Sequence, residues 1–247
     1  YKNCGNDHSA RDIQVLVSSH SDEVYGNTGF RFVRIDVEDP NATVLFKSFV
    51  AVSIFRDLPY LGDFECSDLL VNEIYATARR TCHLCMQSML WDGIKRDKLV
   101  WIGDMHPELL TITSVFGYDD CIAKGLDHVC RQFPLPGFIN MKPSYSLWFV
   151  VILYDLYLYT GREDIVEKHL DYVQDLFHVL DGLVDQNGKM NFPGYFFDWA
   201  THDSINSNEG GSRESRIGVR ALFLIALDRA IKLLKIFGKD TDALYQL

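Results

Sequence analysis

The chain has 247 residues, of which 47% are hydrophobic, so it is long enough for one large domain with a sizeable core. Lysine and arginine total 24 against 34 aspartate and glutamate residues, and the net charge of −10 argues against nucleic acid and anionic membranes as partners. No apolar run reaches the length of a membrane span.

Residues 1–60 are predicted to contain β-strands. β-Branched and aromatic residues alternate or run together in "IQVLVSS", "FRFVRIDV" and "VLFKSFVAVSIF", and turn residues separate the first two segments and follow the second. Three or four strands are too few to close a sandwich with two good faces. We therefore expect residues 1–60 to be the C-terminal part of a larger β domain.

From about residue 61 the apolar residues recur with helical spacing. Ser67 is the predicted N-cap of a helix over 67–90, and Pro107 is predicted in the first turn of a helix over 107–118. Further helices are predicted over 119–133, 146–160, 163–184 and 215–238. Consecutive antiparallel helices predict a mainly α fold, which periodicity alone leaves open between a helical toroid and a bundle.

The cysteines are too few for a disulfide-rich scaffold. Cys82 and Cys85 form a C-x-x-C pair, but the pair lies within a helical pattern and no second pair follows at zinc-site spacing. We therefore expect buried small side chains at these positions, and no metal ion or other cofactor.

The connection between the first two helices, "WDGIKRDKLVWIGD" at residues 91–104, gathers three aspartates among two tryptophans. Carboxylates beside aromatic rings are typical of glycoside hydrolysis, because one carboxylic acid must protonate the leaving oxygen and a flat ring can hold a sugar. The alternative is a solvated loop in which Lys95 and Arg96 neutralise the aspartates. Composition alone leaves both interpretations open.

Three segments together, "GDFECSDLLVNEIY", "WDGIKRDKLVWIGD" and "FFDW", resemble the bacterial α-L-rhamnosidases of glycoside hydrolase family 78. The acidic segment of that family has the form D-x-x-x-R-[DE]-[RK]-L-x-W-x-G-D. It is matched here by Asp92, Arg96, Asp97, Lys98, Leu99, Trp101, Gly103 and Asp104. The upstream "GFRFVRI" is similar to the last strands of the β-sandwich that precedes the (α/α)6 barrel of the family.

The resemblance implies a mainly α fold, in which residues 61–247 form the N-terminal portion of an (α/α)6 toroid, the catalytic domain of a six-hairpin glycosidase. Residues 1–60 would be the last strands of the preceding β-sandwich. The implied activity is the inverting hydrolysis of terminal α-L-rhamnosides by the full-length protein, so the expected partner is a rhamnose-containing glycan. A periplasmic or secreted location is expected on the same ground.

The resemblance also implies roles for single residues. Asp97 matches the general acid, and Asp92 and Asp104 match carboxylates that hold the hydroxyl groups of the sugar. Apart from the resemblance, the flat rings of Trp91 and Trp101 are candidate platforms for the sugar ring.

A second set of implied contacts follows later in the chain. Asp198 and Trp199 match an Asp-Trp pair that orients the sugar and packs on it, although an N-cap and a core indole would explain this pair equally well. Tyr195 is expected in an apolar wall of the site. For its neighbours Phe196 and Phe197, simple core packing is the favoured interpretation.

The sequence departs from the family pattern in three places. Gly93 and Ile94 stand where the family commonly has Cys-Pro, and Asp97 is one methylene shorter than the usual glutamate. Leu147 or its neighbours fill a position near the fourth helix where the family tends to have an aspartate. The identity of the sugar is therefore open.

An inverting glycosidase needs a second carboxylate to activate water. In the family this base is a glutamate in the last third of the barrel, and Glu209 and Glu214 come too early to match it. We therefore expect a fragment that is inactive by itself and able to self-associate through exposed helix faces.

Two other classes of function stay open. One is a non-catalytic or degenerate carbohydrate-binding relative. The other is a six-hairpin glycosidase for another deoxy-sugar or a uronic acid, for which Arg213, Arg216 and Arg220 are possible carboxylate clamps, although we expect them to face solvent.

Overall fold

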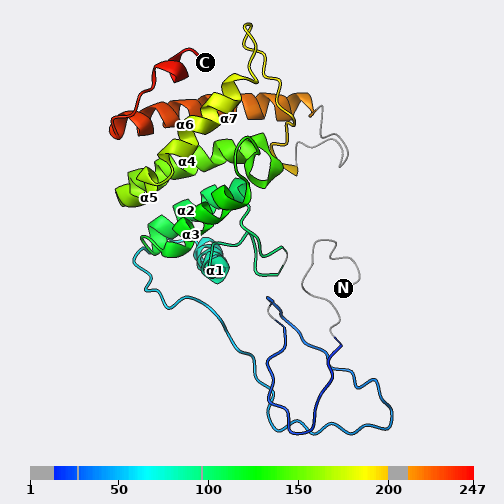
Figure 1. The fold of residues 1–247 in the computed structure, drawn as a ribbon. Coiled ribbons are helices and arrows are strands. Elements are labelled where there is room, and N and C mark those ends of the chain that lie inside the picture. Colours follow the sequence, from blue (N-terminus) through cyan, green and yellow to red (C-terminus); the bar gives the residue numbers. More distant parts are fainter. Residues whose placement is uncertain (1–13, 27, 96, 200–210) are drawn as a thin grey trace.

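The structure is a computed structural model, and it describes residues 14–26, 28–95, 97–199 and 211–247 (Figure 1). The described residues form seven α-helices and two short 3₁₀ helices, which confirms the prediction of a mainly helical fold. The helices are α1 (Leu69–Cys85), α2 (Ile102–Val115), α3 (Asp120–Gln132), η1 (Ile139–Met141), α4 (Pro143–Thr160), α5 (Glu163–Glu167), α6 (Leu170–Asp181), α7 (Arg213–Ile236) and η3 (Asp242–Tyr245).

The prediction of sandwich strands is wrong for the described part of residues 1–60. Residues 14–26 and 28–60 contain no β-strand, and the part before residue 54 runs as long loops away from the helices (Figure 1). A strand persists only where a neighbouring strand pairs its backbone N–H and C=O groups, and this segment finds no such partner in the described structure. Its apolar side chains stay exposed, as Phe32 does at 74%.

Two helix starts differ from the prediction for identifiable reasons. Asp68, not Ser67, caps α1, because its Oδ1 accepts hydrogen bonds from the backbone N–H groups of Leu70 and Val71. Helix α2 begins at Ile102, well before Pro107, because the Oδ1 atom of Asn140 accepts from the Ile102 N–H at 3.1 Å. A side chain from a distant segment thus supplies the cap that the local sequence lacks.

The helix predicted over 163–184 is broken into α5 and α6 at His169, which is only 4% exposed. The imidazole lies edge-on to Phe149 of α4, and its Nε2 is 3.1 Å from Asp127 of α3. Inserting this ring between two neighbouring helices requires the backbone to leave helical geometry. By contrast, Gly161 ends α4 in the left-handed region, at a φ of 65°, as predicted.

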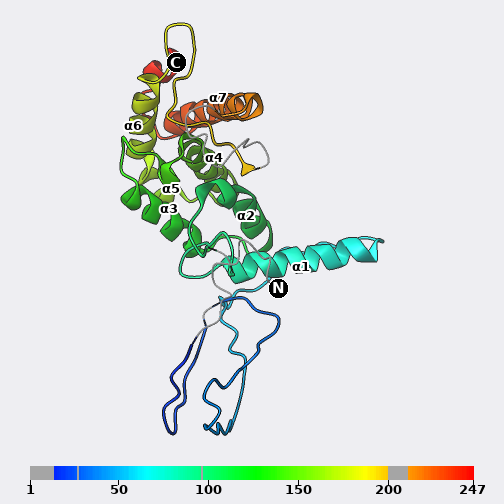
Figure 2. The same ribbon diagram turned by 90° about the vertical axis from the view of Figure 1, so that its right-hand side faces the viewer.

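Helix α4 is the centre of the packed layers. It has almost no polar face, it packs against α2 on one side and α7 on the other, and α1 lies beyond α2 (Figures 1 and 2). The outermost helices keep apolar side chains exposed: Leu69, Leu70 and Ile74 on α1, and Ile217, Leu224 and Ile225 on α7. Self-association through these faces stays a prediction.

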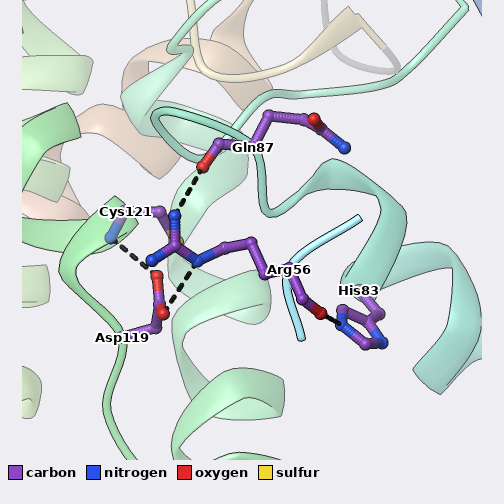
Figure 3. A network of polar contacts seen from close by, with 5 residues as sticks. All are labelled: Arg56, His83, Gln87, Asp119 and Cys121. Atoms are coloured by element: carbon purple, nitrogen blue, oxygen red, sulfur yellow. Dashed lines mark hydrogen bonds and ion pairs between the residues drawn. The ribbon is translucent and has the colours of Figure 1, made fainter. Parts of the chain in front are cut away.

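A polar network anchors the segment that enters the helical region (Figure 3). Arg56 donates from Nε to Asp119 at 2.8 Å and from a terminal nitrogen to the Gln87 carbonyl at 3.2 Å. Asp119 also caps α3 by accepting from the Cys121 N–H, and the His83 imidazole contacts the Arg56 carbonyl at 2.7 Å. This network fixes residues 54–58 against α1 and α3, where they line a groove of about 370 Å³ with Gln87.

In the described part of the chain, no helix has both the length and the apolar composition needed to cross a membrane. Cys82 and Cys85 are buried, as predicted, and burial raises the pKa of both thiols to about 12. Within the same residues, no three metal-ligating side chains gather in one place.

Candidate active site

The segment 91–101 forms a loop before α2, and its first aspartate holds this loop closed. Asp92 donates from its backbone N–H to the Leu99 carbonyl, and its Oδ1 accepts from the Leu99 N–H, both at 3.0 Å. One oxygen of this carboxylate therefore shapes the loop. Arg96, which belongs to the matched motif, lies outside the described residues.

Asp97 is half-buried within this loop. Its Oδ2 accepts a hydrogen bond from the indole Nε1 of Trp101 at 3.2 Å, so the carboxylate and the ring orient each other. Trp101 occupies the N-cap position of α2, and its ring lies edge-on to Tyr145 with centroids 6.1 Å apart. Two of the predicted site residues thus form one rigid unit.

Gly103 lies between these residues and explains part of the motif. A Cβ atom at this position would lie 2.3 Å from the Tyr145 ring, which is far inside van der Waals contact. The backbone of Gly103 does not adopt a positive φ, so its conformation does not explain the glycine. The close approach of the Tyr145 ring does, because a side chain would occupy the same space.

Asp104 is exposed in the first turn of α2, where a negative charge is favourable. One turn later, Glu108 has a pKa raised to about 8, first by burial and then by the charges of Asp104 and Asp92. Asp92 and Asp104 therefore both raise the pKa of Glu108, whose carboxyl group carries a proton at neutral pH. Asp97, in contrast, contacts Trp101. Sequence reasoning did not include Glu108 in the site, although its i+4 spacing from Asp104 was a usable signal.

The segment 195–199 contacts Tyr145 of α4, the residue that also contacts Trp101. The Phe196 ring is 6.0 Å from Tyr145 and 5.3 Å from Trp199, and its carbonyl accepts from the Ser144 hydroxyl at 2.5 Å. A continuous row of rings therefore joins Trp101 to Trp199. Both predicted segments, distant in sequence, lie at one end of helices α2 and α4.

Trp199 is 66% exposed, so the alternative of a core indole is wrong. Asp198 is also exposed, and its Oδ1 accepts from the Trp199 N–H at 2.6 Å. An exposed indole beside an exposed carboxylate is suited to packing on a sugar and bonding to its hydroxyl groups.

Tyr195 is only 8% exposed. Its hydroxyl donates to the Met190 carbonyl and accepts from the Phe192 N–H, so it is used inside the fold. Its predicted contact with the sugar stays untested. Phe197 packs its ring against Gly218 of α7, in agreement with the core packing expected for it.

The other residues singled out in the sequence lie away from this row of rings or outside the described structure. Leu147 is fully buried in α4, and Glu214 is exposed in the first turn of α7. Glu209 lies outside the described residues. Arg216 and Arg220 donate to the Gly211 and Gly188 carbonyls, and Arg213 is exposed at the start of α7.

Comparison with known proteins identifies the family to which the chain belongs. Residues 59–246 match the family model described as the bacterial α-L-rhamnosidase six-hairpin glycosidase domain, and the chain therefore belongs to this family. The resemblance seen in the sequence is confirmed. The helices are part of a six-hairpin glycosidase domain.

Individual relatives are distant. An α-L-rhamnosidase of Formosa agariphila is 25% identical over 187 residues, which cover 66% of this chain and 19% of that protein. The solved structure of a family 78 rhamnosidase of Bacillus sp. GL1 is 22% identical, with a TM-score of 0.65 over 78% of this chain and 21% of that one.

A rhamnosidase from Klebsiella oxytoca, solved with rhamnose bound, is also 22% identical, with a TM-score of 0.57 over 73% of this chain and 36% of that chain. At this identity the two structures show the fold alone. The present chain spans about a fifth of the Formosa protein and of the Bacillus structure.

Proposed function

We propose that this chain supplies the acid side of the sugar site in an inverting α-L-rhamnosidase. Asp97 protonates the glycosidic oxygen, and Asp92 and Asp104 accept hydrogen bonds from hydroxyl groups of the sugar. Trp101 and Trp199 offer aromatic rings to its apolar face.

The row of rings that joins Trp101 to Trp199 is the observation that carries this proposal. Through these ring contacts, two segments about a hundred residues apart in the sequence lie together. One segment carries Asp97 and the other carries Asp198. A solvated loop with incidental charges would not need to contact a distant Asp-Trp pair. The hydrogen bond from Trp101 to Asp97 further supports a fixed orientation of the acid.

The alternative is a carbohydrate-binding relative without chemistry. It is favoured by the fully buried Leu147, because Leu147 or one of its neighbours fills a position where the family tends to have an aspartate. Both functions predict sugar binding, so only hydrolysis separates them.

The test uses Asp97→Asn in the full-length protein, with Asp175→Asn as the control, because Asp175 is an exposed aspartate on α6. We expect kcat for a natural rhamnoside to fall by about 10²- to 10⁴-fold in Asp97→Asn and to stay unchanged in the control. For an aryl rhamnoside, kcat of Asp97→Asn should fall by a smaller factor, because the aryl leaving group depends less on protonation by an acid.

Undiminished turnover of the natural rhamnoside by Asp97→Asn would refute the role of Asp97. Absence of any turnover by the wild-type full-length protein, together with measurable binding of L-rhamnose, would favour the carbohydrate-binding alternative.

A further inference from the structure

A lysine lies within the row of rings. The Nζ atom of Lys142 is 4.9 Å from the centroid of Phe196, 5.7 Å from that of Trp101 and 5.9 Å from that of Tyr145. These four residues, called the Lys142 cluster below, come from three separate segments. Lys142 itself is half-buried at the N-cap position of α4.

Among the described residues, no carboxylate forms an ion pair with the ammonium of Lys142. Lys168, Lys232 and Lys239 each lie within 4.0 Å of an aspartate oxygen, whereas none of the described carboxylates comes that close to Lys142. Its Nζ also donates no hydrogen bond to any described residue. Burial lowers its pKa, since part of its hydration is lost without a carboxylate to replace it.

The rings compensate only in part for this loss. An aromatic face attracts a cation, but it accepts no conventional hydrogen bond, and the ammonium has three N–H donors. A ligand oxyanion is the group that would satisfy both the charge and the donors.

The cluster is also part of the candidate site. Trp101 donates a hydrogen bond to Asp97, and Phe196 contacts the exposed Trp199, so the two rings that Lys142 contacts also touch the proposed acid and the proposed sugar platform. A ligand seated on Trp199 would therefore approach the ammonium.

We infer that Lys142 binds an anionic sugar, one that carries a carboxylate or a sulfate ester, beside the sugar held by the aspartates. This inference rests on the proposed function for the location of the site. It assigns the lysine a role in substrate specificity and leaves the proton transfer to other residues.

The net charge of −10 and the three aspartates oppose an anionic ligand at long range. At physiological ionic strength, however, charges more than about 8 Å apart are largely screened, whereas a contact with the ammonium is direct. The net charge therefore slows the approach of such a ligand more than it weakens the bound state.

The test measures binding to the 247-residue chain by titration calorimetry. The ligands are methyl galactopyranosiduronate, methyl galactopyranoside 6-sulfate, neutral methyl galactopyranoside and L-rhamnose. The variants are Lys142→Met, which keeps the apolar stem, Lys142→Arg, which keeps the charge, and Lys232→Met as a control on an exposed, paired lysine of α7.

We expect at least one anionic galactoside to bind about tenfold more tightly than the neutral one. Lys142→Met should remove this preference, and Lys142→Arg and Lys232→Met should retain it. Preference for the uronate or for the sulfate identifies which oxyanion is the ligand. Thermal melting of each variant identifies any loss that is due to unfolding.

Equal binding of the neutral and anionic galactosides would overturn the inference, as would a preference that survives in folded Lys142→Met. L-rhamnose reports separately on the proposed function. If rhamnose does not bind while the Lys142-dependent preference is present, the proposal that Asp92 and Asp104 hold a rhamnose on this chain fails and the anion site stands.

Discussion

Glu108 gives the sharpest prediction, because its protonation couples the candidate site to the stability of the fold. Burial and the charges of Asp104 and Asp92 raise its pKa from the ordinary value of 4.5 to about 8. The folded chain therefore holds a proton at neutral pH that the unfolded chain has released. The stability that this proton provides is complete below pH 4.5 and is lost as the pH rises through about 8.

The magnitude follows from the difference between the two pKa values. At about 1.4 kcal/mol for each pH unit, the full range from 4.5 to about 8 corresponds to at most about 5 kcal/mol. Glu108 is half-buried, so relaxation and water will reduce this figure, and we expect about 2–4 kcal/mol. Cys82 and Cys85, which face the same carboxyl group, titrate near 12 and do not contribute in this range.

The assay is urea denaturation of the wild-type chain and of Glu108→Gln at pH 5, 7 and 9. Glutamine mimics the protonated acid, so the two proteins should be similar at pH 5, and the variant should be more stable at pH 9 by the amount above. Asp104→Asn removes one cause of the raised pKa and should reduce the pH-dependent loss. Glu73→Gln, an exposed carboxylate on α1, is the control and should follow the wild type.

A stability difference between wild type and Glu108→Gln that is the same at all three pH values would refute the reasoning. It would mean that Glu108 ionises in the folded chain as easily as in the unfolded one.

Three further predictions concern packing, the anchored segment and activity. Gly103→Ala should lower the free energy of unfolding by about 1–3 kcal/mol, measured by denaturation, because its methyl group would collide with Tyr145; an unchanged value would show that this ring moves freely. Asp119→Ala should cost about 2–4 kcal/mol in the same assay, because it leaves Arg56 unpaired and removes the cap of α3, whereas Asp120→Ala, an exposed neighbour, should cost less. The 247-residue chain alone should show no turnover of an aryl α-L-rhamnoside at any pH, because the proposed acid and its neighbouring carboxylates lie on a single loop and the helix after it. Turnover would make Glu209 and Glu214 the first candidates for the base.

The sequence predicted the helices whose information is local. The unbroken apolar run of α4 and the glycine after it specify a buried helix and its end without reference to any other segment. The break at His169 could not be predicted, because it depends on Phe149 and Asp127 from other helices. The early start of α2 likewise depends on Asn140, nearly forty residues away.

The strands predicted before residue 60 failed for a related reason. Alternating β-branched residues indicate a preference for extended backbone, but the described segment forms no strand. A strand also requires a hydrogen-bonded partner, and the identity of that partner is not encoded in the alternation itself. The local pattern alone therefore failed to predict whether a sheet forms.

The candidate site shows the same division between local and distant information. The motif gave Asp92, Asp97 and Asp104 as a group, but their surroundings come from other segments. Glu108 became part of the site through burial against α1, where its backbone carbonyl accepts from the Cys82 thiol, and Lys142 through rings contributed by both loops.

These two residues both make the charge of the site less negative. Glu108, being protonated at neutral pH, removes one negative charge beside Asp92 and Asp104, and Lys142 adds one positive charge beside Trp101. The region is therefore less negative than its three motif aspartates indicate. Repulsion among carboxylates opposes their gathering around one ligand. A neutral Glu108, and a Lys142 that pairs with none of the described carboxylates, together make such a site compatible with binding a neutral or anionic sugar.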